Sequence, residues 1–277
     1  MFSKYVQKIA RRIVILVDRL VNYRWFNFPF GRKPMAKREL YEKLALEAAQ
    51  IKYPEIDEYE HEKGFVIDSE WLHNLALHTQ VVIKKSELCY QHGRLIYTTV
   101  RDYIHKNHPK YINIIETGTA RGFSALSIAK ALADADIEEK IITFDLLPHD
   151  VAMYWNCIDD LEGPKTRAEL LGNYSELINR YLVFCQGDTR IILPKIQISK
   201  IHFAFLDGAH TYNYVIHEFE CIKDKQERGD IIFFDDYTFD LFPGVVKAVN
   251  EICRVHKYSK RVISASKNRG YVIATKK

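Results

Sequence analysis

The chain has 277 residues, 47% of them hydrophobic, which is enough for one large α/β domain with a sizeable core plus an extension. Its five cysteines are scattered and form no Cys-x-x-Cys pair, which argues against a disulfide framework or a zinc site and suits a reducing compartment. The net charge of +4 conceals an asymmetry: residues 1–40 hold ten Lys/Arg against Asp18 and Glu39, a balance of +8 that leaves −4 for the remainder.

Residues 1–30 combine an apolar stripe with positive charge. Apolar side chains from Phe2 to Leu20 recur at the four-three spacing of one helix face, and an aromatic cluster extends from Trp25 to Phe30. One interpretation is a helix that binds peripherally to an anionic membrane, at its inner face. The other, which the abundance of core stripes favours, is a helix packed on its own domain or on a second subunit of a homo-oligomer.

The start of the chain lacks the features of an export signal. The longest early apolar run, Ile13 to Val17, is far too short to cross a bilayer, and no small-residue cleavage site follows it. The sequence therefore predicts no signal peptide and, together with the cysteine pattern, a cytoplasmic protein.

We expect a basic, helical N-terminal extension over residues 1–85, followed by one domain over 86–277. Periodic segments early in the chain predict three helices: 35–50, one from near Trp71 capped by Asp68 or Ser69, and one over Ser86–His105. Residues 54–63 are acidic and non-periodic, which predicts a surface loop.

From Tyr111 onward, strand-like segments alternate with helical ones, which predicts a mainly parallel sheet. The expected strands are Tyr111–Ile115, Lys140–Asp145, Leu182–Gln186, Ile201–Leu206 and Ile231–Phe234, followed by a hairpin of Arg261–Ala265 and Tyr271–Thr275. The expected helices begin near Phe123, at a Thr166/Glu169 capping box, near Tyr212 (running to Gly229) and at Pro243. Residues 146–164 are longer than a simple connection requires.

A glycine turn follows the first expected strand. Its residues are Glu-Thr-Gly-Thr-Ala-Arg-Gly from Glu116 to Gly122, in which Gly118 and Gly122 let the backbone approach a ligand closely. The dinucleotide fingerprint Gly-x-Gly-x-x-Gly is absent, and the carboxylate of Glu116 would repel a pyrophosphate. S-adenosylmethionine carries an amino group and a sulfonium and no phosphate, so it suits this turn better.

Acidic residues follow five successive strands of the expected sheet. They are Glu116, Asp145, Asp188, Asp207 and Asp235. The carboxyl ends of parallel strands meet at the edge where α/β proteins bind ligands. Each residue singly could cap a helix, but five caps at one edge is the less favoured interpretation, because collected carboxylates repel one another. The pattern therefore predicts a ligand site at this edge.

These motifs resemble those of class I S-adenosylmethionine-dependent methyltransferases over residues 86–277. The resemblance implies a Rossmann-like α/β fold, with a mostly parallel seven-stranded sheet and an antiparallel closing strand. It implies that the first motif, with Glu116, Gly118, Thr119 and Gly122, cradles the methionine end of the cofactor. Asp145 would then accept hydrogen bonds from the ribose hydroxyls, and Asp188 from the adenine amino group.

A narrower resemblance concerns Asp207-Gly208-Ala209-His210 and the pair Asp235-Asp236. They are similar to the metal-dependent branch that includes the macrolide-sugar O-methyltransferases and, more distantly, catechol O-methyltransferase. That resemblance implies that Asp207, Asp235 and Asp236 hold Mg²⁺ or Mn²⁺, for which carboxylate oxygens are suitable ligands. It implies that His210 is the general base, with Asp207 beside it in the catalytic site.

The function expected from these residues is metal-assisted O-methylation of a hydroxyl on a sugar, glycan or small-molecule acceptor. A nucleic-acid methyltransferase is one alternative, suggested by the basic arm. Amino-directed DNA enzymes resembling this fold carry Asn/Asp-Pro-Pro-Tyr/Phe after the fourth strand, whereas Asp207-Gly208-Ala209-His210 stands here, which disfavours a nucleic-acid partner. A second alternative is an inactive binding protein, which loss of the acidic residues would mark; all are present.

Overall fold

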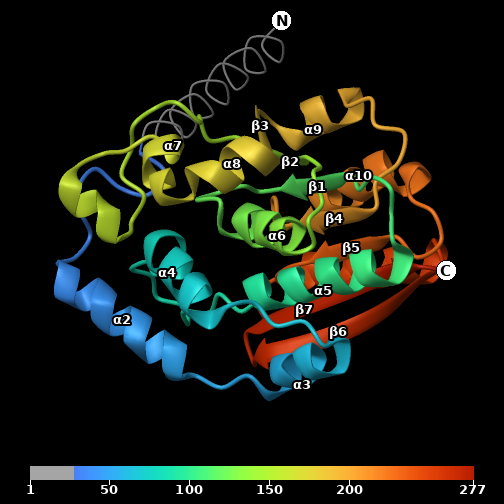
Figure 1. The fold of residues 1–277 in the computed structure, drawn as a ribbon, viewed down its shortest axis with the longest axis horizontal. Coiled ribbons are helices and arrows are strands. Elements are labelled where there is room, and N and C mark those ends of the chain that lie inside the picture. Colours follow the sequence, from blue (N-terminus) through green and yellow to red (C-terminus); the bar gives the residue numbers. More distant parts are fainter. Residues whose placement is uncertain (1–27) are drawn as a thin grey trace, which may run out of the picture.

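The computed structural model describes residues 28–277, so the predicted arm helix and the first half of the aromatic cluster, Trp25 and Phe26, lie outside the described residues. Within them the chain forms one seven-stranded sheet in the order β3-β2-β1-β4-β5-β7-β6 (Figure 1). The strands are β1 (Ile114–Thr117), β2 (Ile141–Asp145), β3 (Leu182–Gln186), β4 (Phe203–Leu206), β5 (Ile231–Phe234), β6 (Tyr258–Ser266) and β7 (Arg269–Lys276).

Strand direction confirms the predicted sheet. β3, β2, β1, β4 and β5 run parallel, and β7 pairs antiparallel with both β5 and β6. Four-residue strands such as β1, β4 and β5 are buried along their whole length, as expected for central strands of a covered parallel sheet. The chain leaves β1 toward β2 and later returns to β4 on the other side, so a crevice opens at the carboxyl ends of β1 and β4.

Helices cover both faces of the sheet (Figure 1). α5 (His92–Asn107) and α6 (Phe123–Asp134) pack against one another on one face, beside α4 (Ser69–Thr79). α10 (Tyr212–Ile222) and α11 (Pro243–Val255) contribute to a second cluster on the other. Shorter elements are α7 (Arg167–Leu170), α8 (Ser175–Tyr181), α9 (Thr189–Ile192) and the 3₁₀ turns η1 (Ile158–Glu162), η2 (Gly172–Tyr174), η3 (Leu193–Lys195) and η4 (Lys223–Lys225).

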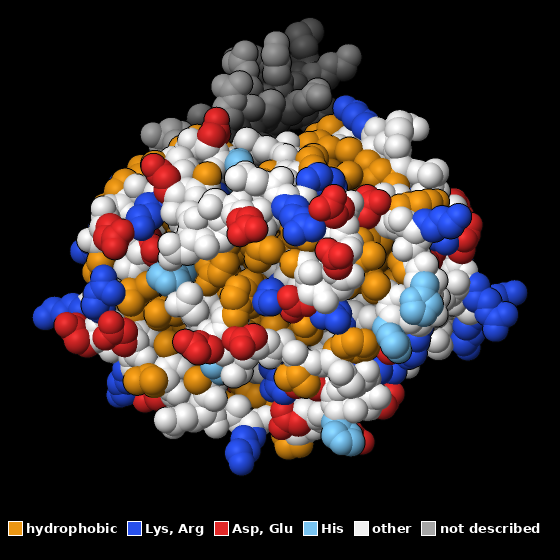
Figure 2. Space-filling model, viewed as in Figure 1, with side chains coloured by type: hydrophobic (Ala, Val, Ile, Leu, Met, Phe, Trp, Pro, Cys, Tyr) orange, Lys and Arg blue, Asp and Glu red, His pale blue; other side chains and the backbone are white. Residues whose placement is uncertain are grey.

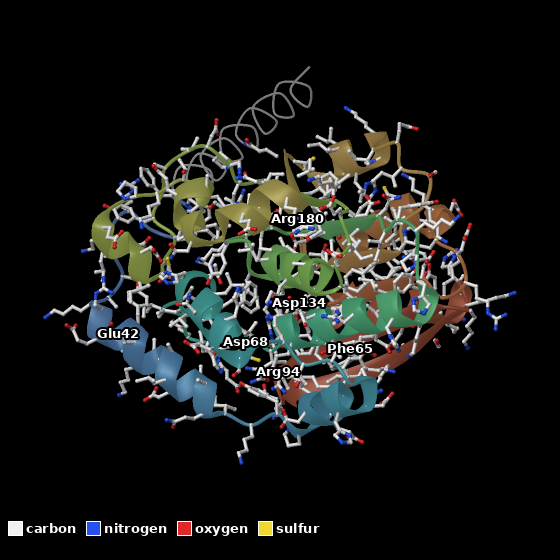
Figure 3. All side chains as sticks on the ribbon, viewed as in Figure 1. Glu42, Phe65, Asp68, Arg94, Asp134 and Arg180 are labelled. Carbon is white, nitrogen blue, oxygen red and sulfur yellow. The ribbon has the colours of Figure 1, made fainter. Side chains whose placement is uncertain are left out.

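The predicted loop over 54–63 is wrong, because these residues form α3 (Pro54–Lys63). Proline at the first position, acids in the first turn and a left-handed Gly64 after the last residue are all favourable helix-end signals. A buried ion pair completes the helix: Arg94 Nε donates to Glu60 at 3.0 Å, and Arg94 also contacts Asp57 at 2.6 Å (Figure 3 labels Arg94).

Other predicted elements differ in their ends. α2 (Arg38–Gln50) and α4 match the predicted helices, and Asp68 caps α4 by accepting from the Trp71 N–H at 2.7 Å. α5 begins at His92 rather than Ser86, because the preceding loop is drawn into tertiary contacts such as Tyr90 Oη with His73 Nδ1 at 2.8 Å. The predicted division at residue 85 stays a prediction.

Differences also occur within the sheet domain. β1 begins at Ile114, since the Asn113 N–H donates to the His202 ring at 3.0 Å and not to a neighbouring strand. The Thr166/Glu169 capping box is confirmed, but its helix is interrupted at Gly172. α10 ends at Ile222, well before Gly229.

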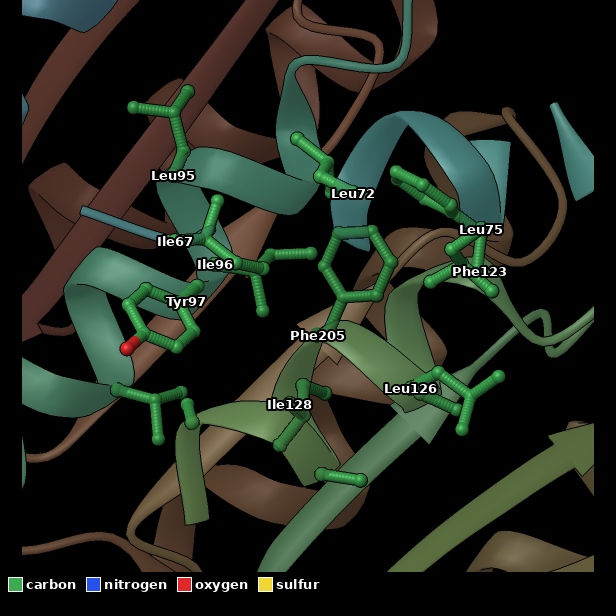
Figure 4. Packing of buried hydrophobic residues seen from close by; sticks show 14 of the residues in the cluster. Ile67, Leu72, Leu75, Leu95, Ile96, Tyr97, Phe123, Leu126, Ile128 and Phe205 are labelled. Atoms are coloured by element: carbon green, nitrogen blue, oxygen red, sulfur yellow. The ribbon is translucent and has the colours of Figure 1, made fainter. Parts of the chain in front are cut away.

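The main core lies between α4, α5, α6 and the sheet (Figure 4). In the close-up the Phe205 ring lies among apolar side chains that include Leu72, Phe123 and Ile96. Gly93 on α5 fits this core because a Cβ there would lie 2.7 Å from the Phe123 ring. Gly93 is the second residue of α5, and this close packing explains why a glycine stands there.

The surface in Figure 2 mixes charges of both signs over the described residues of that face. Among residues 28–277, no helix is both long and apolar enough to cross a bilayer.

Candidate functional site

A cavity of about 350 Å³ opens at the carboxyl ends of the central strands. Its walls are the turns that follow β1, β2, β3 and β4, with Gly118, Asp145, Asp188, Gly208 and His210 among the lining residues. This is the crevice that the strand order creates, and it is the usual ligand site of an open α/β sheet.

Gly118 is required by a contact between two of these turns. Its φ is +90°, and a Cβ there would lie 2.1 Å from the carbonyl oxygen of Asp207. No other residue could bring the turn after β1 so close to the turn after β4. The glycine thus shapes the floor of the cavity and fixes Asp207 next to it.

Asp145 presents a buried carboxylate to the cavity. One oxygen accepts from the Ala120 N–H at 2.6 Å and lies 3.3 Å from the Arg167 guanidinium, and the other accepts from the Leu147 N–H at 2.8 Å. Burial raises the pKa of Asp145, although these donors oppose the shift. Each carboxylate oxygen can accept a further hydrogen bond, so Asp145 remains able to bind a cis-diol.

Three of the predicted cofactor-binding residues do not line the cavity. Glu116 is fully buried behind it, where its oxygens accept from the hydroxyls of Ser124 and Thr143. Burial raises the pKa of Glu116 to about 7. Thr119 is buried against Thr143, and Gly122, with φ +89°, fits against Leu171.

Asp188 lines the cavity but is also a helix cap. It accepts from the Arg190 N–H at 2.9 Å and forms an ion pair with the Arg190 guanidinium at 2.5 Å. The hydrogen bonds from Arg190 lower the pKa of Asp188. It is therefore an ionised acceptor at the end of the cavity formed by the turn after β3.

A second group of acids lies beside the cavity. Asp207, His210 and Asp236 each offer a ligand atom within 4.8 Å of the others. His210 Nε2 lies 3.0 Å from Asp207 and 3.2 Å from Asp236. Burial opposes protonation of His210, but the hydrogen bond and charge of Asp207 prevail and raise the pKa of the ring to about 9. Burial and the charge of Asp235 raise the pKa of Asp207 to about 7.

Asp235 stands apart from the group that the structure brings together. Its side chain is fully buried, accepts from the Asp236 N–H at 2.6 Å and pairs with Arg269 at 3.2 Å. Arg269 also pairs with Asp236. The sequence prediction of three carboxylates thus finds Asp207 and Asp236 converging on His210, with Asp235 held behind them by an arginine.

Asp236 adopts a backbone conformation that is uncommon for a residue with a side chain, with φ +55°. Such residues cost of order 1–3 kcal/mol and persist where the surroundings hold them, often at functional sites. Here Asp235 and Arg269 hold Asp236 so that its free oxygen faces His210.

The donor set fits a hard divalent cation. Carboxylate oxygens and one imidazole within 4.8 Å suit Mg²⁺ or Mn²⁺, and there is no thiol among them. The charges of Asp235 and Asp236 contribute to the raised pKa of Asp207, and a bound cation would neutralise part of this negative charge.

Sequence reasoning missed Arg269 and Glu218. Arg269 lies in the hairpin that was predicted only as a connection, and nothing local marks it as a partner of Asp235. Glu218 on α10 is buried beneath Gly208 and accepts from Thr117 and Thr189 at 3.1 and 2.9 Å. Burial raises the pKa of Glu218 to about 7. The only sequence signal for it is an acid on the buried stripe of a helix.

Comparisons with known proteins agree with this geometry. Residues 115–237 match the model of a family described as a methyltransferase domain. No curated protein matches the sequence significantly.

Three solved structures illustrate the similarity of fold. The O-methyltransferase NovP aligns with a TM-score of 0.52 at 18% identity, over 70% of this chain and 83% of its own. TomG from Streptomyces achromogenes, in complex with S-adenosylmethionine, gives 0.53 at 16% identity, over 76% and 91%. An O-methyltransferase from Bacillus cereus, in complex with S-adenosylhomocysteine, gives 0.51 at 14% identity, over 82% and 93%.

At these identities the structures establish the fold, and the family match covers the segment that carries the glycine turn and the acidic turns. Residues 115–237 are thus similar in sequence to a methyltransferase domain, and the described chain has the fold of these O-methyltransferase structures.

Proposed function

We propose that the protein transfers a methyl group from S-adenosylmethionine to a hydroxyl of a sugar, glycan or other small-molecule acceptor, assisted by Mg²⁺ or Mn²⁺. The observation that carries this proposal is the convergence of Asp207, His210 and Asp236 at the mouth of the cofactor cavity. The O-methyltransferases of similar fold favour oxygen as the acceptor atom.

In this proposal the cavity holds the cofactor through its backbone and its acids. Gly118 leaves room for the methionine end, Asp145 accepts from the ribose, and Asp188 accepts from the adenine amino group. Glu116, Thr119 and Gly122 act behind the wall, because they support the turn without lining the cavity. The ring of Tyr214, which lines the same cavity, offers an apolar surface to the adenine.

The reactive step uses His210 as the base. S-adenosylmethionine would supply the electrophilic methyl group, and Asp207 and Asp236 would hold a divalent cation, whose chemistry when bound is to lower the pKa of a hydroxyl. The hydroxyl oxygen would bond to the methyl carbon as the carbon–sulfur bond breaks and S-adenosylhomocysteine leaves. His210 would take the proton as a neutral ring, which requires that a cation offset the charges of Asp207 and Asp236 that raise its pKa to about 9. A neighbouring Phe242 ring, 4.8 Å from the imidazole between centroids, fixes the orientation of His210.

The metal requirement has a direct test. Protein stripped with a chelator should lose turnover, and Mg²⁺ or Mn²⁺ should restore it. Because Asp207 and Asp236 carry the cation, a D207N/D236N variant should also lose the Mn²⁺ binding that is seen by paramagnetic broadening. Full turnover in the stripped variant would refute the metal and leave the fold assignment intact.

We also infer from the sequence that residues 1–30 either contact an anionic membrane or pack on protein. Each Lys or Arg near such a membrane contributes about 1 kcal/mol, and this attraction fades beyond a Debye length. Sedimentation with anionic vesicles at low and high salt separates the two. Salt-sensitive binding that deletion of residues 1–30 removes supports the membrane role, and absence of binding at low salt excludes it.

A further inference from the structure

A second cavity, of about 550 Å³, lies next to the acidic cluster. Three segments far apart in the sequence form it: the loop before α5, the turn between β6 and β7, and the segment before α11. Its walls include Lys84, Lys85, Glu87, Leu241, Phe242 and Arg269. None of these residues lines the cofactor cavity.

Two of the wall residues of this second cavity contact the cluster of Asp207, His210 and Asp236. Arg269 holds Asp235 and Asp236, and Phe242 packs on the His210 ring. A molecule in the second cavity would therefore reach the same cluster that borders the cofactor cavity. This is the arrangement required for an acceptor, which must meet the methyl group from the opposite side to sulfur.

The polar part of the wall is predominantly cationic. Lys84 and Lys85 are exposed, and within residues 28–277 neither has a carboxylate at ion-pair distance. Partial burial and the charge of Arg269 lower the pKa of Lys84, and Asp236 opposes this shift. Arg269 is already balanced by Asp235 and Asp236, and Glu87 is the one acid among the described wall residues. The two lysines thus carry charge that no partner in the described chain satisfies.

The remaining wall is apolar. Leu241 is 50% exposed, and Phe239, two residues earlier in the same segment, is 75% exposed. Exposed large apolar side chains that gather beside a cavity are typical of a binding surface. The wall therefore combines cations on one side with an apolar surface on the other.

We propose that this cavity binds the methyl acceptor and that the acceptor carries an anionic group, a phosphate or a carboxylate, which Lys84 and Lys85 contact. An apolar portion of the same molecule packs on Leu241 and Phe242. The proposal rests on the proposed function, because it assigns the acceptor class for that reaction. It narrows the acceptor from any hydroxyl compound to an anionic one.

The test compares charged and neutral diols on the full chain with Mg²⁺ and S-adenosylhomocysteine. Three pairs serve as probes: glucose 6-phosphate with glucose, glucuronate with methyl glucoside, and 3,4-dihydroxybenzoate with catechol. Binding is measured by saturation-transfer NMR and calorimetry, so the readout does not depend on turnover. We expect at least one charged member to bind about tenfold more tightly than its neutral partner, with the preference lost at high salt. The class of anion is identified by which charged probe, phosphate or carboxylate, shows the larger increase in affinity over its neutral partner.

Matched variants decide whether the lysines are responsible. The preference should vanish in K84Q/K85Q and persist in K110Q, which removes an exposed lysine elsewhere. Equal affinity for charged and neutral members would overturn the proposal. So would absence of binding by every charged member at about 10 mM, above the Kd of a weak millimolar complex, or an unchanged preference in K84Q/K85Q.

Failure of the proposed function gives a different result. If S-adenosylhomocysteine itself does not bind, the methyltransfer proposal fails, whatever the diols do. If it binds and the charged diols show no preference, only the anionic acceptor is wrong.

Discussion

The two cavities beside His210 are built in different ways. The cofactor cavity is formed by turns that directly follow strands β1 to β4, so the sheet itself positions its walls. The second cavity is formed by a loop, a hairpin turn and a segment before α11, which only tertiary packing brings together. A fold can therefore fix its cofactor site through topology, while the site for the other substrate is left to connections that can vary without disturbing the sheet.

The largest effect should come from His210, which lines the cofactor cavity and contacts Phe242 in the wall of the second cavity. Replacement of His210 by alanine should reduce methyl transfer by roughly 10²–10⁴-fold, because it removes the base. The affinity for S-adenosylhomocysteine, measured by calorimetry, should change little. The control is H61A, which removes an exposed histidine of α3. Equal loss of cofactor affinity would show that His210 serves the cofactor cavity and not the reaction.

Arg269 should matter first for folding, because it compensates Asp235 and Asp236 at the border of the second cavity. Breaking a buried ion pair leaves an uncompensated charge, so R269Q should lower the free energy of unfolding by about 3–5 kcal/mol. Urea unfolding measures this loss. Mg²⁺ should recover more stability in R269Q than in the wild type, because a cation can replace the missing charge. Equal effects of Mg²⁺ on both proteins would separate Arg269 from the metal site.

This difference in construction explains what the sequence could predict. Gly118, Asp145 and Asp207 follow strands, and strand ends can be located from hydrophobic pattern, so their convergence was predictable. Arg269 and Lys84 lie in connections whose path depends on packing, and no periodicity marks their destination. The helix over 54–63 was missed for a related reason: its stability comes from end signals and from Arg94, which lies far along the chain.

Charge and burial also decided which strand-end acids face a ligand. Glu116 and Asp145 end neighbouring strands in the sequence pattern, yet Glu116 points into the layer under α6 while Asp145 lines the cavity. The two acids differ in depth along the strands: Glu116 pairs with Thr143 inside the sheet, whereas Asp145 lies two residues farther on, at the carboxyl end of β2. The predicted strand ended at Ile115, whereas β1 continues to Thr117, so Glu116 lies inside the strand and not in the turn that follows it.

A smaller effect is expected within the cofactor cavity. D145A should weaken the binding of S-adenosylhomocysteine by about 1.5–3 kcal/mol, the usual scale of hydrogen bonds to a charged group. Binding of charged diols in the second cavity should not change. D224A removes an exposed acid and serves as the control. Unchanged affinity for S-adenosylhomocysteine in D145A would mean that the ribose lies elsewhere.

The smallest effect on cofactor affinity is expected for Glu116, which supports the wall of the cofactor cavity without lining it. Its folded pKa of about 7 lies above the ordinary value of 4.5, because burial disfavours the charged form. Between these values the folded state holds a proton that the unfolded state has lost. Stability should therefore fall as pH rises from about 4.5 to 7, by roughly 3 kcal/mol, and level off above. In E116Q this slope should disappear, because glutamine keeps the hydrogen bonds available without titrating.

Urea unfolding at a series of pH values measures the slope in E116Q and in the wild type. The affinity of E116Q for S-adenosylhomocysteine should stay close to that of the wild type. A large loss of affinity with no change in the pH slope would place Glu116 in contact with the cofactor instead of behind the wall.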